Sequence, residues 1–242
     1  MKPDAPIYSL KRDARALARE AGIPLHAALD RIARSRGYRA WSHLVASVQP
    51  RHAARLAESL SPGELVLIGA RPQQGKTLLG LELALAARGM GREGHVFTLA
   101  ESSAGVAARL RDLGVRASVA NLCVDTSDDI CADYVIDRLS RADGPVLAVI
   151  DYLQVLDQKR SHPELGAQVT ALRDFARASA AVIAVTSQID RAFDQAAKRL
   201  PGIADIRLPN RLDVGLFDRL CMLHEGQMVL LTPDARRVEY PG

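Results

Sequence analysis

ARPQQGKT (residues 70–77) is the stretch that decides the fold of this chain. It fits the phosphate-loop pattern G-x-x-x-x-G-K-[ST] except at its first position, where Ala70 replaces glycine. The apolar run ELVLIGA (64–70) leads into it, and an amphipathic helical pattern starts at Lys76. This order aims backbone N–H groups and a helix N-terminus at bound phosphate, whereas a chance Gly-Lys-Thr in a surface turn lacks such flanks. We therefore expect a nucleotide-binding loop.

The residue types in this loop predict individual contacts with ATP and Mg²⁺. Gly75 allows the backbone to approach the phosphates, Lys76 reaches the β- and γ-phosphates, and the Thr77 hydroxyl ligates Mg²⁺. The residues expected to bind the nucleotide are Ala70, Arg71, Pro72, Gln73, Gln74, Gly75, Lys76, Thr77 and Leu78.

Three further polar residues follow apolar, strand-like runs. Asp151 ends PVLAVID, where a carboxylate is placed to act with Thr77 on the Mg²⁺ side of the site. Glu101 follows HVFTLA and is a candidate for the base that orients the attacking water, although glutamates also occur as ordinary first-turn helix charges. Gln188 follows AVIAVTS and is a candidate sensor of the γ-phosphate. The expected catalytic residues are Lys76, Glu101 and Gln188.

Short β-rich runs alternate with helical patterns beyond residue 63, which indicates an α/β fold with a mostly parallel sheet covered by helices on both faces. Strands are expected at 64–70, 95–99, 121–124, 145–150 and 181–187. Helices are expected near 76–89, 102–113, 129–141 and 164–180, and a closing hairpin is expected from 216–223 and 227–232.

The amino-terminal part has a different character. Three short amphipathic patterns in residues 1–48 predict a small helical module. Residues 49–62 are expected to be a linker or a helix that joins this module to a domain of residues 63–242. Residues 1–60 hold 11 Lys and Arg against 5 Asp and Glu, whereas the rest of the chain holds 21 against 23. A basic module suits a polyanionic partner, but such bundles serve in docking or packing more often than in reading DNA.

The composition of the whole chain is that of an ordinary globular protein, with 242 residues, 48% of them hydrophobic and 25% charged. No apolar run approaches the roughly 20 residues that cross a bilayer, and the start lacks the apolar stretch of a signal peptide. We therefore expect a cytoplasmic protein without a membrane partner. The three cysteines lack CxxC spacing, which predicts buried free thiols and neither a disulfide nor a zinc site.

Four motifs carry a family resemblance. In order and spacing, ARPQQGKT, FTLAES, VIDYLQ (149–154) and TSQIDR (186–191) closely resemble the ATPase domain of the DnaB replicative helicases, within the RecA-like superfamily. The resemblance covers roughly residues 60–223 and includes the Ala-Arg-Pro opening of the loop. It implies that Lys76 and Thr77 bind nucleotide and magnesium, that Asp151 is the magnesium-side carboxylate, and that Gln188 is the coupling or sensor residue.

A RecA-like order of strands also follows from the resemblance. In that order, residues 181–186 pair with both 64–69 and 146–150.

The departures from the family pattern are specific. Ala100 fills the place of the family's catalytic glutamate and Glu101 comes one residue later, so hydrolysis is expected to be slow or differently arranged. Residues 199–219 replace the family's usual run after the sensor, and no arginine finger is assigned. The small basic module stands where DnaB has its primase-binding domain. We therefore infer a stand-alone relative of the replicative helicase.

Family members contact single-stranded DNA through the loops after the Asp strand and after the SQ strand. The corresponding loops here are 156–163 and 189–212. Exposed loops also gather basic residues without purpose. The candidate DNA-binding residues are Lys159, Arg160, Arg191, Lys198, Arg199, Arg207 and Arg211.

Three functions are open at this point. The leading hypothesis is an ATP-dependent, DNA-associated motor or helicase-like ATPase that works as a homo-oligomeric ring or filament. The alternative is a regulatory nucleotide-binding switch that hydrolyses ATP weakly and recruits a protein partner through the basic module. The third is a small-molecule kinase, a class that shares the phosphate loop but places the strands 64–69 and 146–150 side by side.

Overall fold

A computed structural model describes residues 7–46, 50–72, 74–113, 115, 122–156, 159, 162–195, 200–207 and 212–238. Its centre is a seven-stranded sheet in which the first six strands are parallel and the last is antiparallel. The strands are β1 (Leu65–Ala70), β2 (Glu93–Thr98), β3 (Leu122–Asp125), β4 (Val146–Asp151), β5 (Val182–Gln188), β6 (Arg219–His224) and β7 (Gln227–Leu231).

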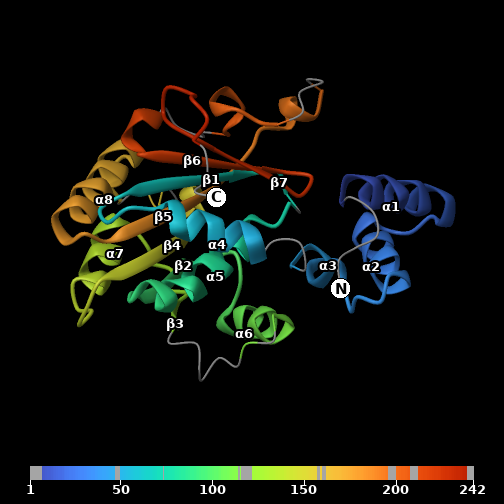
Figure 1. Ribbon diagram of the computed structural model, residues 1–242, viewed down its shortest axis with the longest axis horizontal. Helices are drawn as coiled ribbons and strands as arrows, with labels where there is room; N and C mark the ends of the chain where they lie inside the picture. The colour runs from blue at the N-terminus through green and yellow to red at the C-terminus, as the bar shows by residue number, and fades with distance from the viewer. Residues whose placement is uncertain are drawn as a thin grey trace.

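The helices lie around this sheet and beside it (Figure 1). The α-helices are α1 (Ile7–Ala21), α2 (Leu25–Ser35), α3 (Trp41–Ala46), α4 (Pro50–Ser59), α5 (Lys76–Ala86), α6 (Ser103–Asp112), α7 (Ala132–Leu139) and α8 (Leu165–Ser179). Short 3₁₀ helices span Ala87–Met90, Leu153–Val155, Arg191–Gln195, Ile203–Asp205 and Val214–Leu216.

The strand order is β3-β2-β4-β5-β1-β6-β7. Strand β5 pairs in parallel with β1 on one side and with β4 on the other, which confirms the RecA-like order. The arrangement expected of a kinase, with β1 next to β4, is not present, so the strand order contradicts the kinase hypothesis. The expected hairpin is also confirmed, since β6 and β7 pair antiparallel.

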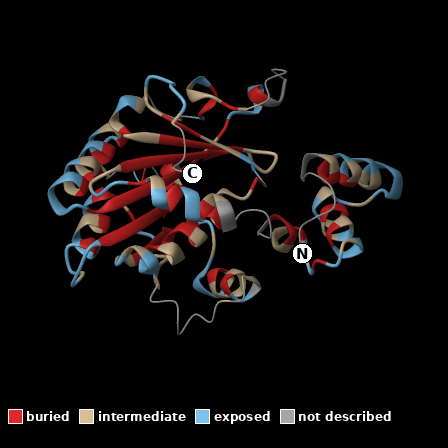
Figure 2. Cartoon of the chain, viewed as in Figure 1, coloured by how far each residue is buried: buried red, intermediate tan, exposed pale blue. Residues whose placement is uncertain are grey.

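Alternating residues of each central strand face two separate cores. In β1, Leu65 and Leu67 point to the core under α7 and α8, whereas Val66 and Ile68 point to the core under α4, α5 and α6. The central strands β1, β4 and β5 are therefore buried almost throughout, as Figure 2 shows. This burial explains why the strand sequences are continuous apolar runs and do not alternate between apolar and polar residues.

Local contacts account for the differences from the expected helix ends. The helix expected near 129–141 begins at Ala132, whose N–H donates to the buried Gln168 Oε1 at 3.0 Å. The helix expected at 76–89 is α-helical only to Ala86 and continues as a 3₁₀ turn. Cys221 is buried, Cys131 is partly exposed and Cys123 is exposed, so the expectation of buried thiols is confirmed only for Cys221.

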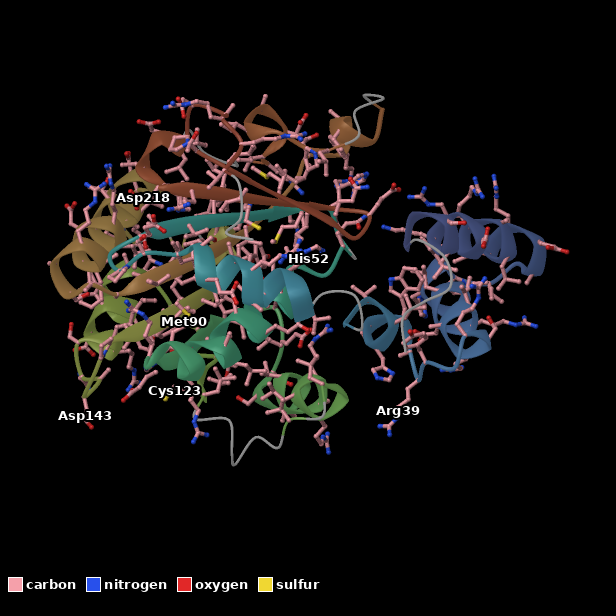
Figure 3. All side chains as sticks on the ribbon, in the orientation of Figure 1. Arg39, His52, Met90, Cys123, Asp143 and Asp218 are labelled. Atoms are coloured by element: carbon pink, nitrogen blue, oxygen red, sulfur yellow. The ribbon has the colours of Figure 1, made fainter. Side chains whose placement is uncertain are left out.

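Helix α4 packs on the sheet and contacts the closing hairpin. Its Leu56 is fully buried in the core with α5, and the Nε2 atom of His52, labelled in Figure 3, lies 2.9 Å from the carbonyl oxygen of Gly226. Burial lowers the pKa of His52, and its hydrogen bond with the backbone opposes this effect. The segment expected as a linker or helix is thus a helix that is fixed to the sheet.

The first three helices form their own apolar cluster. Leu10, Leu29 and Leu44 are buried within it, and Leu78 from the start of α5 joins the same cluster. The helical expectation for this part of the chain is met, and the contact through Leu78 places α3 next to the phosphate loop. Among the described residues, no helix is both long and apolar enough to span a bilayer.

Candidate nucleotide site

The phosphate loop connects the end of β1 to the start of α5. Gly75 precedes the helix with a φ of 87°, a left-handed conformation that a residue with a Cβ atom adopts only at a cost. The N–H of Leu79 donates to the Gly75 carbonyl at 2.8 Å, so the helix starts immediately after this turn. The N–H groups of the first helical turn therefore have no earlier helical carbonyl to bind and are available for an anion.

Two side chains from this loop meet the carboxylate of Asp151 at the end of β4. Lys76 Nζ lies 2.8 Å from Asp151 Oδ1, and Thr77 Oγ1 lies 2.9 Å from Asp151 Oδ2. A third donor, the buried Thr186 hydroxyl on β5, also binds Oδ1. The Lys76 ammonium lies 5.0 Å from the centre of the Tyr152 ring. The predicted loop and the predicted carboxylate therefore form one site.

The burial of Asp151 explains why this network is needed. Its side chain is only 2% exposed, and a buried carboxylate is costly unless it is paired and hydrogen-bonded. The Thr77 hydroxyl uses its proton in the bond to Asp151, which leaves its oxygen lone pairs for a cation.

A hydroxyl and one carboxylate fit Mg²⁺, which prefers oxygen ligands and takes most of its ligands from phosphates and water. Consistent with such a sparse protein donor set, the described residues contain no cluster of three His, Cys, Asp or Glu placed to hold a metal.

Glu101 lies beside this network. A small cavity of about 10 Å³ is lined by Thr77, Glu101 and Asp151, together with Leu81, Val96, Thr98, Val106 and Val149. The Glu101 carboxylate binds Arg109 of α6, whose Nε lies 2.5 and 2.6 Å from the two carboxylate oxygens. The structure thus brings the predicted base to the Mg²⁺ side of the site and pairs it with a cation that the sequence did not single out.

Gln188 lies at the end of β5, directly beside the start of the loop. It is paired in register with Ala70, and the N–H of Ile189 donates to the Ala70 carbonyl at 3.0 Å. Arg207 donates its backbone N–H to the Gln188 carbonyl at 2.7 Å, and its Nη1 lies 3.5 Å from Gln188 Oε1. A candidate DNA-binding residue therefore contacts the candidate sensor.

Further backbone bonds fix this contact. Ile189 and Ile206 form an antiparallel bridge, and Asp190 N–H donates to the Asp205 carbonyl at 2.7 Å. We call these bonds, together with those between Gln188 and Arg207, the 188–207 clamp. Gln154, which follows β4, adds a side-chain bond to the Arg207 carbonyl at 3.3 Å.

The other candidate DNA-binding residues differ in their surroundings. Arg191 is exposed, as is Arg207, on the segment that follows β5. Lys159 is exposed but forms an ion pair with Asp129, which raises the Lys159 pKa and lowers that of Asp129. Arg160, Lys198, Arg199 and Arg211 lie outside the described residues, as does Gln73 of the loop.

The outer residues of the loop have structural partners. Arg71 Nη1 donates to the Ile189 carbonyl at 3.0 Å, and Gln74 Oε1 accepts from the Glu225 N–H at 2.9 Å. Pro72 is exposed, whereas Leu78 is buried against the amino-terminal helices. These contacts fix the conformation of the loop on both sides of the phosphate-binding turn.

A larger cavity of about 280 Å³ opens on the start of α5. Its lining residues are Trp41, Ser42, Val45, Gly75, Lys76, Thr77, Leu78 and Arg109. The sequence did not point to Trp41, Arg109 or Thr186 as part of the site. Thr186 alone carries a visible signal, since it is polar at the carboxyl end of an apolar run.

Comparisons with known proteins agree with this fold. Residues 109–225 match the family model described as the DnaB-like helicase C terminal domain. The replicative DNA helicase DnaB of Leifsonia xyli subsp. xyli (strain CTCB07) is 25% identical over 185 residues, which cover 63% of this chain. The chain spans only 40% of the length of that relative.

Solved structures show the same fold. A DnaB-like replicative helicase, solved in a study of its interactions with primase, superimposes with a TM-score of 0.59 at 19% identity, covering 74% of this chain and 54% of the helicase chain. Another solved ATPase domain gives a TM-score of 0.58 at 18% identity, covering 74% of this chain and 80% of that domain. A KaiC-like protein from Pyrococcus horikoshii OT3 gives a TM-score of 0.52 at 13% identity, covering 73% of this chain and 82% of that protein.

The family match includes Asp151, Gln188 and Arg207 but begins after the phosphate loop, so it does not test the roles expected of Lys76 and Glu101. Sequence match, strand order and structural likeness together show a RecA-like fold in this chain and a likeness to the DnaB-like helicase C terminal domain over residues 109–225.

Proposed function

We propose that this protein binds ATP with Mg²⁺ at the phosphate loop and hydrolyses it, and that it works on single-stranded DNA as a homo-oligomer. The observation that carries the proposal is the convergence of Lys76 and Thr77 on the buried Asp151, with Glu101 beside them. The match to a helicase domain supports the same reading.

Binding requires that Lys76 exchange one partner for another. Its ammonium is paired with Asp151, and with ATP bound it would contact the β- and γ-phosphates. Thr77 and Asp151 would then hold Mg²⁺, which neutralises charge that develops on the transferring phosphoryl group. Thr186 keeps its bond to Asp151 and maintains the orientation of that carboxylate.

Hydrolysis requires Glu101 as the proton acceptor. The attacking water forms a bond to the γ-phosphorus, the bond to the β–γ bridging oxygen breaks, and Glu101 receives the proton of the water. Because Arg109 holds both oxygens of Glu101, one of these bonds has to open for the carboxylate to reach the water. We therefore expect slow turnover by the isolated chain.

Contact with DNA and with a neighbouring subunit supplies the remaining parts of the proposed activity. The exposed Arg191 and Arg207 lie on the segment after β5, and Arg207 is bonded to Gln188. A polyanion bound there would act on the end of β5 beside the loop. An arginine that a neighbour supplies to the γ-phosphate typically raises turnover by about 10³–10⁵.

ATP turnover tests this proposal. Turnover is measured over a range of protein concentrations, with and without single-stranded DNA, for the wild type and for Lys76→Ala. We expect the rate per subunit to rise with protein concentration and with DNA, and the Lys76→Ala variant to lose ATP binding. Retention of ATP affinity by Lys76→Ala would contradict the phosphate-loop assignment. Nucleotide binding that is unaffected by DNA, with negligible turnover, would favour the regulatory switch.

The melting temperature completes this test. Lys76→Ala leaves the buried Asp151 without its cation, so we expect a folded variant that melts at a lower temperature than the wild type.

A further inference from the structure

The amino-terminal helices form one wall of the nucleotide site. Trp41, Ser42 and Val45 of α3 line the 280 Å³ cavity from one side, and Gly75 to Leu78 line it from the other. Figure 1 shows α3 as the helix of this group that approaches the sheet domain. The volume lies near the lower end of the range for small-molecule sites, which is roughly 300–1,000 Å³.

Trp41 is the residue in this wall that has an unused donor. Its side chain is 8% exposed, and the indole Nε1 is buried without a hydrogen-bond partner among the described residues. Its backbone N–H is already bonded, to Asp30 Oδ1 at 2.8 Å, so the ring is held at a fixed place at the start of α3. Buried tryptophan N–H groups usually have a partner, so this donor beside the phosphate loop is available to a ligand.

A second cavity places α1 and α2 at the other side of the same loop. It measures about 170 Å³ and is lined by Lys11, Arg15, Leu25, Arg71, Pro72, Gln74, His224 and Glu225. The amino-terminal helices therefore face the loop across two cavities.

We propose that Trp41 binds the nucleotide, with the face of its ring against the ligand and its indole N–H donating to a nucleotide oxygen. The proposal rests on the proposed ATP binding and adds a binding residue from outside the sheet domain. Ser42 and Val45 form the rest of this wall. The basic helical module would thus have a direct role in nucleotide affinity.

The chain contains a single tryptophan, so its own fluorescence reports on this residue. The wild type is titrated with ATP and Mg²⁺ while emission is recorded, and calorimetry measures the affinity independently. We expect the emission to change with the same dissociation constant that calorimetry gives. We expect Trp41→Phe, which keeps a ring but lacks the N–H, to bind about 3- to 10-fold more weakly.

Two variants separate a contact from a loss of folding. Tyr38→Phe alters a residue of the same apolar cluster that does not line the cavity, and it should keep wild-type affinity. Trp41→Ala should bind more weakly than Trp41→Phe, at temperatures where circular dichroism shows both folded.

The outcomes are distinct from those of the turnover test. If calorimetry shows ATP binding by the wild type, and Trp41→Phe and Trp41→Ala bind equally well, the Trp41 contact is wrong, with or without an emission change, and the proposed function stands. If the wild type does not bind ATP at all, the proposed function fails and this inference fails with it.

Discussion

The carboxylate of Glu101 is bound at both of its oxygens by the guanidinium of Arg109, eight residues further along the chain. Glu101 is 18% exposed and Arg109 is 37% exposed, so the pair lies at the edge of the site and not in its interior. Because Arg109 also lines the cavity that faces α3, one ion pair connects the candidate base with the wall formed by the amino-terminal helices.

Replacing Glu101 by glutamine tests its role as the base. The amide cannot accept the proton of the attacking water, so we expect turnover to fall by about 10²–10⁴-fold while ATP affinity changes little. Single-turnover hydrolysis and calorimetry measure the two quantities. As a control, Glu93→Gln alters a partly exposed glutamate at the start of β2, away from the loop, and should keep wild-type turnover. Unchanged turnover in Glu101→Gln would assign the base elsewhere.

The hydroxyl of Thr77 should determine how strongly ATP binding depends on Mg²⁺. We expect chelation of Mg²⁺ to weaken ATP binding by the wild type by about tenfold or more and to have little effect on Thr77→Val, which lacks the metal-binding oxygen. Thr77→Ser keeps that oxygen and should behave as the wild type. Calorimetry with and without a chelator measures this difference, and equal Mg²⁺ dependence in all three proteins would exclude Thr77 as a ligand.

Arg207 should couple DNA to the site without contributing to ATP binding. Its bonds to Gln188 predict that Arg207→Ala keeps ATP affinity but loses about fivefold or more of the stimulation by single-stranded DNA. Arg141→Ala is the matched control, since Arg141 is exposed and lies at the opposite end of the sheet, before β4. If both variants respond to DNA as the wild type does, the segment after β5 is not the DNA-coupling element.

The buried carboxyl of Glu82 on α5 predicts that stability depends on pH. Desolvation raises its pKa from 4.5 to about 7, and Oε2 has no hydrogen-bond partner among the described residues. The native state therefore holds the proton more tightly than the unfolded chain, so the free energy of unfolding falls as pH rises from about 4.5 to about 7. The loss amounts to roughly 3 kcal/mol.

Urea unfolding at pH 5 and pH 8 measures this effect. Glu82→Gln cannot ionise, so it should lose less stability than the wild type between these two pH values and be the more stable protein at pH 8. Glu58→Gln, at an exposed position of α4, should follow the wild type. Equal pH dependence in Glu82→Gln and the wild type would show that Glu82 is not the responsible group.

The sheet and the phosphate site could be predicted from sequence because their signals are local. Each central strand is buried on both faces and so reads as an unbroken apolar run, and the loop sequence fixes its own turn through Gly75. Asp151 was found because a carboxylate directly after such a run is rare unless it has a partner.

The residues that were missed depend on tertiary contacts. Thr186 is polar at the end of an apolar run, but only the pairing of β5 with β4 places it against Asp151. Trp41 reads as the start of a short amphipathic helix, and only the packing of Leu78 into the amino-terminal cluster brings it to the loop. Neither the periodicity nor the spacing of the sequence predicts this contact between Leu78 and the amino-terminal helices.

The 188–207 clamp has a consequence for the loop that it closes. Its backbone hydrogen bonds hold Gln188 and Arg207 next to each other. Two residues that are 19 positions apart in the sequence are therefore held side by side. Because these bonds are made by the backbone, replacing the Arg207 side chain would leave them, and the register of Gln188 with Ala70, in place.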